Sequence, residues 1–277
     1  MTAPDVLIAQ ISDLHVKGPG ELAYGKVDTA AALARCVKEL NRLAPRPHLV
    51  VISGDLVDTP APVEYAHLKT LLAPLEIPFL AVPGNHDDRA MLREALAQQG
   101  APEGAINLAR KVGAVDVLAL DSGVPGKPHG ELDAKTLRWL DDELASSATR
   151  PALLFLHHPP FVTGIAHMDV QNLRNSAALA EIVRHHPRVR LVAAGHVHRA
   201  TLTQFAGVPA TICPAPNHAV ALDLDAHLPP SLTVEPPAFH LHAWFAGEGV
   251  GRLVTHHVPI GDFAGPYPFF GSDGRLL

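Results

Sequence analysis

Apolar runs that end in polar residues recur through the first 200 residues of the chain. The run 49–53 is followed by Gly54 and Asp55, which predicts a buried strand and a tight turn that presents one carboxylate. Four further apolar runs end in histidine, aspartate or asparagine: residues 8–15, 79–87, 153–158 and 191–198. Five strands that deliver such side chains at one end predict a metal site at one rim of a sheet, with Asp55 at its centre.

Apolar residues at helical spacing separate the first three of these strands. They predict a helix over 29–44, with Asp28 as its cap, and a second helix over 62–74 that begins at Pro62. The order strand, helix, strand, helix, strand is typical of a parallel sheet with crossover helices. Such a sheet binds ligands at the carboxyl ends of its strands, which is where Asp55 is expected.

Strands and helices continue to about residue 198. Further helices are predicted over 88–98, after a cap at Asp133, and from a cap at Asn175 to about His185. The predicted strands are 105–109, 114–120, 151–156 and 188–194, and a long loop is expected over 161–174.

The last third of the chain has no convincing helical period. Short strands are predicted at 201–205, 208–213, 219–224, 238–245 and 250–258, and we expect them to form a second, mainly antiparallel sheet packed on the first. Alternation along one of these strands places His240 and His242 on a solvated face. Without a linker or repeat, residues 1–265 are expected to form one domain. The aromatic and glycine-rich tail 266–277 is expected to be an arm or an oligomer contact.

Composition narrows the possible functions. The chain has 277 residues, 47% of them apolar, and can bury a substantial core. Its formal net charge of -6 argues against binding to a phosphate backbone by bulk charge. The amino-terminal apolar segment is too short for a signal peptide or a membrane span, so a cytoplasmic location is expected. Cys36 and Cys213 are interpreted as reduced core thiols, with a disulfide as the alternative.

The polar residues at the strand ends are candidate metal ligands. They are too many for one tetrahedral zinc ion and suit two ions in a shared site. Asp55 is the candidate bridge because its strand should be central. Imidazole ligands favour Zn, Fe, Mn or Co over Ca or Mg, while the carboxylates and the amide provide hard oxygen ligands. The seven candidates are Asp13, His15, Asp55, Asn85, His157, His196 and His198.

Two metal ions in one site suit phosphoester cleavage, because they lower the pKa of a water molecule and neutralise charge on the phosphoryl oxygens. His86 directly follows Asn85 and is predicted to donate a proton to the leaving group, with Asp87 or another carboxylate holding its tautomer. Each motif alone would more simply be a surface loop or a turn. Their joint occurrence in this order at strand ends favours a functional site.

At these residues the sequence resembles the calcineurin-like metallophosphoesterases. The resemblance spans residues 5–198 and implies an α/β fold, a four-layer α/β/β/α sandwich. It implies that His86 is the catalytic histidine near the leaving group, beside Asn85. The first metal would take Asp13, His15, Asp55 and His198, and the second Asp55, Asn85, His157 and His196. The matching motifs are Asp13-x-His15, Gly54-Asp55, Gly84-Asn85-His86-Asp87, His157 and Gly195-His196-Val197-His198.

Within that family the chain is similar to class III cyclic-nucleotide phosphodiesterases and bacterial glycerophosphodiesterases. This similarity implies a bacterial cytoplasmic enzyme, a dinuclear centre of Fe, Mn or Zn, and a homodimer or larger oligomer. The segments that carry it are 84–88, 120–122, 130–132, 157–160, 164–165 and 168–169.

The sequence indicates the substrate and the residues that contact it less strongly than it indicates the metal ligands. His158, Asn217 and His218 are candidate substrate contacts, although a loop histidine is an equally good interpretation of His218. The leading hypothesis is hydrolysis of small phosphodiesters, either 3′,5′-cyclic nucleotides or glycerophosphodiesters. A phosphomonoesterase, a nuclease and a metal-free protein-binding scaffold are the alternatives. The acidic balance and the lack of a basic aromatic stripe argue against long nucleic acids as partners, and no membrane contact is expected.

Overall fold

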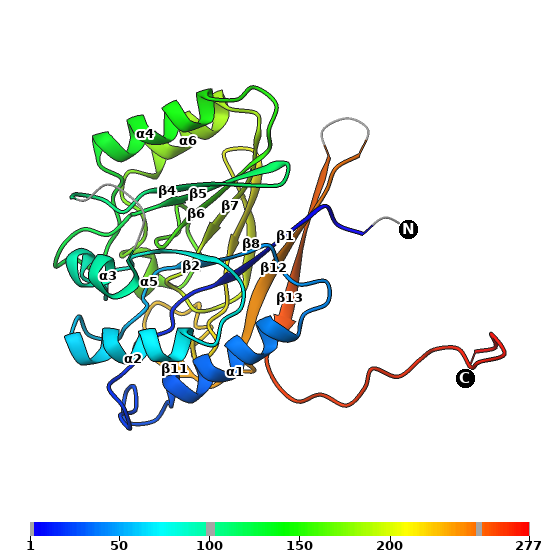
Figure 1. The fold of residues 1–277 in the computed structure, drawn as a ribbon. Coiled ribbons are helices and arrows are strands. Elements are labelled where there is room, and N and C mark those ends of the chain that lie inside the picture. Colours follow the sequence, from blue (N-terminus) through cyan, green and yellow to red (C-terminus); the bar gives the residue numbers. More distant parts are fainter. Residues whose placement is uncertain (1–2, 98–102, 248–250, 277) are drawn as a thin grey trace.

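In this computed structural model, two β-sheets pack face to face and helices cover their outer sides (Figure 1). The structure describes residues 3–97, 103–247 and 251–276. The α/β/β/α sandwich implied by the resemblance is therefore confirmed.

The first sheet has five strands in the order β13-β12-β1-β2-β3. The pairs β1–β2 and β2–β3 are parallel, as the alternation of strands and helices predicts. β1, rather than the strand before Asp55, lies in the middle of the sheet. Its strands are β1 (Val6–Ile11), β2 (Leu49–Ser53), β3 (Phe79–Val82), β12 (Ala238–Phe245) and β13 (Arg252–Pro259).

The second sheet has six strands in the order β4-β5-β6-β7-β9-β8. Its inner pairs, β5–β6, β6–β7 and β7–β9, are parallel, and the outer pairs are antiparallel. The strands are β4 (Leu108–Val112), β5 (Val115–Leu120), β6 (Ala152–Leu156), β7 (Val189–Ala194), β8 (Thr201–Phe205) and β9 (Val208–Ile212). A separate two-stranded ladder pairs β10 (Ala219–Val220) with β11 (Leu232–Thr233).

Six helices are seen among the described residues. α1 and α2 lie on the outer face of the first sheet, and α4 and α6 lie on the outer face of the second (Figure 1). They are α1 (Thr29–Arg42), α2 (Pro62–Leu72), α3 (Arg89–Leu96), α4 (Ala134–Ala145), α5 (Ala166–Asp169) and α6 (Ser176–His185). The short helix α5 lies inside the segment 161–174, which was predicted to be a loop.

The central strands are apolar on both faces because both faces are covered. Along β6, Leu153 and Phe155 belong to the core that includes the first sheet, whereas Leu154 and Leu156 belong to the core beneath α4 and α6.

The predicted helix caps are largely confirmed. Asp28 accepts a hydrogen bond from the backbone N–H of Ala31, and Asp133 caps α4 in the same way. The prediction for Asn175 is wrong, because its side chain bonds both backbone polar groups of Leu132 instead of the start of α6.

The predicted role of the C-terminal strands is also wrong. Apart from the short antiparallel ladder β10–β11, the described C-terminal strands join the two main sheets: the hairpin β12–β13 pairs with β1 in the first sheet, and β8–β9 extends the second. The edge of β1 that does not pair with β2 is buried, so its backbone N–H and C=O groups require partners. The hairpin β12–β13 supplies them. The predicted strand 219–224 is reduced to the two residues of β10, and Val250 in the predicted strand 250–258 lies outside the described residues.

His240 and His242 do not lie on a solvated face. Both are buried, and the His242 ring lies 5.7 Å from that of Phe155 on the opposite sheet. Alternation alone cannot distinguish a strand face covered by a second sheet from one covered by water. Cys36 and Cys213 are free and buried, as predicted.

The tail after Ile260 extends away from the sandwich (Figure 1) and exposes large aromatic side chains, including Tyr267 at 76% and Phe269 at 78%. No helix among the described residues is long and apolar enough to cross a membrane.

We predict that His240→Asn weakens the acid sensitivity of the fold. Burial, helped by His257, lowers the pKa of His240 to about 4, whereas an unfolded histidine has a pKa of about 6.5. The unfolded state therefore binds the extra proton, and stability falls as the pH drops through this interval. Denaturant unfolding should show a smaller loss between about pH 6.5 and pH 4 in the variant than in the wild type. The exposed His227→Asn serves as the control, and parallel pH profiles for all three proteins would contradict the prediction.

Candidate metal centre

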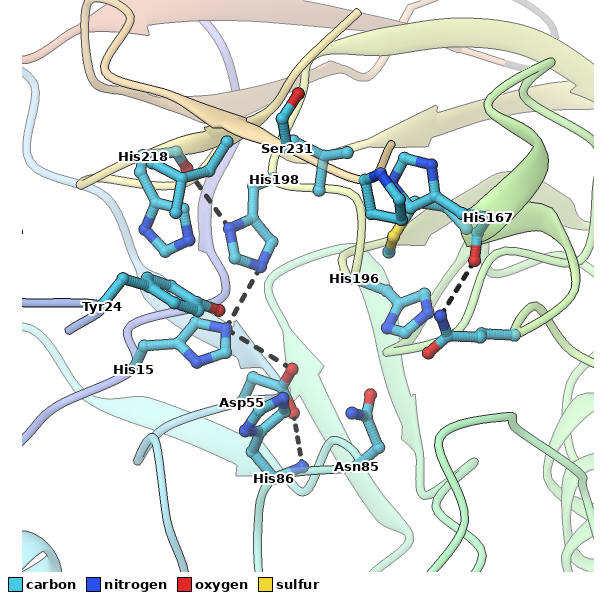
Figure 2. Close-up of a pocket in the computed structure, with 15 residues that line it drawn as sticks. His15, Tyr24, Asp55, Asn85, His86, His167, His196, His198, His218 and Ser231 are labelled. Carbon is cyan, nitrogen blue, oxygen red and sulfur yellow. Dashed lines mark hydrogen bonds and ion pairs between the residues drawn. The ribbon is translucent and has the colours of Figure 1, made fainter. Parts of the chain in front are cut away.

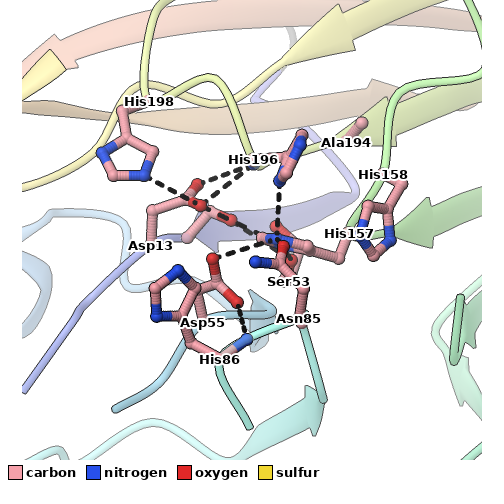
Figure 3. A network of polar contacts seen from close by, with 12 residues as sticks. Asp13, Ser53, Asp55, Asn85, His86, His157, His158, Ala194, His196 and His198 are labelled. Atoms are coloured by element: carbon pink, nitrogen blue, oxygen red, sulfur yellow. Dashed lines mark hydrogen bonds and ion pairs between the residues drawn. The ribbon is translucent and has the colours of Figure 1, made fainter. Parts of the chain in front are cut away.

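Five turns converge where the carboxyl ends of the two sheets meet (Figure 3). The turns after β1, β2 and β3 belong to the first sheet, and those after β6 and β7 belong to the second. The sequence predicted a site at one rim of a sheet, whereas the structure forms it between the rims of two sheets. All seven candidate ligands are brought together there.

Five of these seven residues have a left-handed backbone, with φ between 44° and 73°. Such values are uncommon for residues other than glycine and persist only where the surrounding structure enforces them. They turn the side chains back toward one point instead of continuing the strand direction. The five are Asp13, His15, Asp55, His196 and His198.

One group of donor atoms lies around His15. Its Nε2 is 3.1 Å from Nε2 of His198 and 3.6 Å from Oδ2 of Asp55. Nε2 of His198 is in turn 3.4 Å from Oδ1 of Asp13. These four side chains are the first set of ligands that the resemblance implies.

A second group lies around His157. Its Nε2 is 3.2 Å from Oδ1 of Asn85, 3.2 Å from Oδ2 of Asp55 and 3.3 Å from Nδ1 of His196. The Oδ2 atom of Asp55 therefore belongs to both groups. Its other oxygen, Oδ1, accepts a hydrogen bond of 2.9 Å from the backbone N–H of His86, which fixes the orientation of the carboxylate.

The outer nitrogens of three histidines are already engaged. Nδ1 of His157 donates to the carbonyl of Ser53, and Nδ1 of His198 donates to that of His218. Nδ1 of His15 is 3.2 Å from a carboxylate oxygen of Asp58. Hydrogen bonds of this kind fix the tautomer, so that Nε2 of each ring keeps a lone pair directed at the donor groups.

These features fit metal ions. Ligands about 2.0–2.2 Å from one ion lie roughly 3 Å from each other, which is the spacing of both donor groups. Because Nδ1 of each ring already has a hydrogen-bond partner, Nε2 of His15 and Nε2 of His198 direct their lone pairs at each other across 3.1 Å. A bound cation would stabilise two lone pairs that face each other, and it would also offset the charge of two buried carboxylates.

The charges in the site are strongly coupled. Burial alone would raise the pKa of Asp55, but the rings of His157, His86 and His15 outweigh it and hold that pKa well below its usual range. Conversely, burial would lower the pKa of His157, but Asp55 raises it to about 9. Burial raises the pKa of Asp13 to about 6. The shared carboxylate is thus the group most firmly kept ionised.

His86 stands beside the donor groups and lines the cavity above them (Figure 2). Its Nδ1 donates to the backbone carbonyl of Asp58 at 2.7 Å, which leaves Nε2 available. The prediction that Asp87 or another carboxylate holds this tautomer is wrong, because a backbone carbonyl does so. The Asp87 carboxylate accepts backbone N–H groups of Gly84 and Leu56 and so ties two ligand-bearing turns together.

A cavity of about 340 Å³ opens over the donor groups (Figure 2). Tyr24 and His218 lie on one side of it and His167 on the other. The side-chain amide of Gln171, which also lines the cavity, donates to the backbone carbonyl of His167 at 2.9 Å. Sequence reasoning missed Tyr24, His167 and Gln171. Tyr24 lies in a turn with left-handed backbone at Tyr24 and Gly25, and its ring packs 5.3 Å from that of His218, a contact between distant segments that no local sequence pattern signals.

Of the three candidate substrate contacts, only His218 lines this cavity. His158 is fully buried with Nδ1 2.8 Å from Oγ of Ser122. Its ring lies 4.9 Å from that of His196, and one of its nitrogens lies within 4.8 Å of donor atoms of His157 and His196, so His158 adjoins the second donor group without lining the cavity. The amide of Asn217 donates to the backbone carbonyls that follow β1 and so holds the Asp13 turn in place.

The profile of the calcineurin-like phosphoesterases matches residues 6–200. The chain belongs to the calcineurin-like phosphoesterase family. The prediction of a phosphoester-hydrolysing enzyme is thereby confirmed, and the expected family and fold are confirmed with it.

Curated relatives carry diesterase names. The chain is 37% identical over 275 residues to a probable glycerophosphodiester phosphodiesterase GpdQ of Arcobacter nitrofigilis, covering 98% of this chain and 100% of the relative. It is 36% identical over 216 residues to a cAMP/cGMP dual specificity phosphodiesterase of Mycobacterium tuberculosis, covering 76% and 68%. A dimetal phosphatase from Danio rerio shares the fold, with a TM-score of 0.67 at 16% identity, over 93% of this chain and 100% of that one.

We predict that Gly84→Ala disrupts the site although it adds a single methyl group. A Cβ at Gly84 would overlap the Asp55 carboxylate and its backbone nitrogen. The shared carboxylate must then move, so manganese binding measured by calorimetry should be lost or greatly weakened. Gly247→Ala is the matched control, because a Cβ there meets nothing within 4 Å. Equal manganese binding by Gly84→Ala and Gly247→Ala would rule out this dependence.

Proposed function

We propose that the chain is a dinuclear metal-dependent phosphodiesterase that acts on small phosphodiesters. The observation that carries this proposal is the position of Asp55 Oδ2, which lies within 3.6 Å of Nε2 of His15 and 3.2 Å of Nε2 of His157. One oxygen common to two groups of ligands is the arrangement expected of a carboxylate that bridges two ions.

Each proposed ion would be held by mixed nitrogen and oxygen donors, which suits Fe, Mn or Zn. Bound there, two ions would lower the pKa of a water molecule and neutralise charge on the phosphoryl oxygens. The first would take Asp13, His15, Asp55 and His198, and the second Asp55, Asn85, His157 and His196.

His86 is proposed as the proton donor. Because its Nδ1 hydrogen is committed to the carbonyl of Asp58, the protonated ring presents Nε2–H toward the cavity. That proton can pass to the leaving alkoxide, which would otherwise be a poor leaving group. The backbone N–H of the same residue holds Asp55, so one residue orients the shared carboxylate and supplies the acid.

The cavity supports a small diester as substrate. Tyr24, Val220 and Leu232 offer an apolar wall suited to a nucleobase, and His167 and Gln171 offer polar atoms for hydroxyl groups. We therefore propose 3′,5′-cyclic nucleotides as the substrates. Glycerophosphodiesters are the second candidate, because the match to the GpdQ-named relative covers 98% of this chain and 100% of that relative.

We also propose that the chain forms a homodimer or a larger homo-oligomer. The aromatic side chains of the tail, among them Phe263 and Phe270, are exposed on an extended segment and would be covered by a second copy. The cytoplasmic location stays a prediction.

The direct test is a turnover assay of the purified manganese-loaded protein with cyclic AMP, cyclic GMP, glycerophosphodiesters and bis-p-nitrophenyl phosphate. The highest kcat/KM on a cyclic nucleotide would support the leading assignment, and the highest on a glycerophosphodiester would support the second. Absence of turnover on all diesters, with bound metal, would refute both.

We predict that the loss of kcat in His86→Ala depends on the leaving group of the substrate. Loss of a general acid should lower kcat about 10²–10⁴-fold on cyclic AMP, but much less on bis-p-nitrophenyl phosphate, whose leaving group needs no proton. The backbone N–H that orients Asp55 is retained, so manganese content should equal that of the wild type. A similar loss on both substrates would contradict the assignment of His86 as acid.

We predict that Asn85→Ala and His196→Ala each lose one of two bound manganese ions and most of the activity. Both side chains belong to the second donor group only, so the first group stays intact. Metal content by atomic spectroscopy after gel filtration measures this. Gln171→Ala, which removes an amide from the cavity wall outside both groups, should keep two ions. Two ions in all three variants would refute the ligand assignment.

A further inference from the structure

A buried amide behind the metal centre links both sheets. Gln10 lies in β1, is fully buried and belongs to neither donor group. Its Nε2 donates to Oγ of Ser53 at 2.9 Å and to the carbonyl of Ala194 at 3.0 Å. Ser53 is the last residue of β2, before the turn that carries the shared carboxylate, and Ala194 is the last residue of β7, before the turn that carries His196. Figure 3 shows both beside the site.

The orientation of this amide is fixed by its partners. A carbonyl can only accept, so the atom facing Ala194 must be the nitrogen of Gln10. Oε1 then faces Nε2 of His242 at 3.3 Å, and that ring nitrogen must donate. Nδ1 of His242 is 2.9 Å from Oγ1 of Thr255, whose hydroxyl supplies the proton. Burial, with His240, holds the pKa of His242 well below its usual value. The neutral ring therefore has one N–H, which is what this series of hydrogen bonds requires.

The same amide is close to three ligand-bearing turns. The carbonyl of Ser53 accepts Nδ1–H of His157 at 2.9 Å and the hydroxyl of Ser12 at 3.2 Å. Ser12 directly precedes Asp13. A displacement of Ser53 relative to Ala194 would therefore move His157, His196 and Asp13 with respect to one another.

We propose that Gln10 is a positioning residue of the metal centre, which sets the separation of the two sheets where the ligand-bearing turns meet, and that His242 orients its amide. The proposal rests on the metal centre proposed above. Apolar contact between the sheets is non-directional, whereas a hydrogen bond fixes distance and direction. Ligands must be held to within about 0.5 Å of their working positions, which requires directional contacts.

The test uses Gln10→Leu, which keeps a side chain of similar size and removes both donors. Manganese affinity, measured by competition with a chelator, should fall about 10–100-fold, as it does when groups that orient ligands are lost. The exchange-coupled electron paramagnetic resonance spectrum of the manganese pair should also change, because the separation of the ligand sets changes. Ile8→Val is the matched control: it is the preceding residue on the same face of β1, pairs with His242, and alters only apolar packing.

Ser53→Ala provides an independent second variant should Gln10→Leu fail to fold. It removes only the hydroxyl that Gln10 contacts and should change affinity and spectrum in the same direction, to a smaller extent. If both variants have the same manganese affinity and spectrum as Ile8→Val and the wild type, the proposed role of Gln10 is overturned and the proposed function still stands. Failure of the wild type to bind a manganese pair would overturn both.

Discussion

The structure of the site depends on how one buried carboxylate is held. Asp55 directs one oxygen to the backbone N–H of His86 and the other to rings from both donor groups. Burying ionised carboxylates is costly unless they are paired with hydrogen-bond donors or cations. Asp13 lies beside it in an equally buried position. The two acids, the surrounding imidazoles and the tight turns that carry them form one electrostatic unit, and the rims of two sheets must meet for that unit to exist.

The sandwich supplies the rigidity that this unit requires. Left-handed backbone at five candidate ligands is unfavourable in isolation, and such strain persists at functional sites because the rest of the fold enforces it. Two apolar cores, one on either side of the second sheet, fix the strands that lead into the turns. Asp87 then clamps the Gly84 turn to the backbone after Asp55 through three N–H groups. The ligand-bearing turns are thus held in place by buried side chains that bond their backbone, Asp87 among them.

Most of the strands and the candidate metal ligands that follow them were predictable, because strand ends carry a local sequence signal. An apolar run followed by Gly-Asp or Gly-His marks both the strand and the polar residue after it, and parallel order brings those ends together. The pairing of β12 with β1 was not predictable, since it joins residues more than 200 positions apart. Tyr24 and His167 enter the cavity through loop conformations that tertiary contacts decide, and the burial of His240 depends on which face the second sheet covers.

The most direct test of this account is a crystal structure grown with ample manganese, in which anomalous scattering locates the ions. The account predicts two anomalous peaks on either side of the Asp55 carboxylate, with Oδ2 in contact with both ions, His15 and His198 beside one, and Asn85 and His157 beside the other. A single peak that leaves Asp55 out, or none between the two groups of donors, would contradict it.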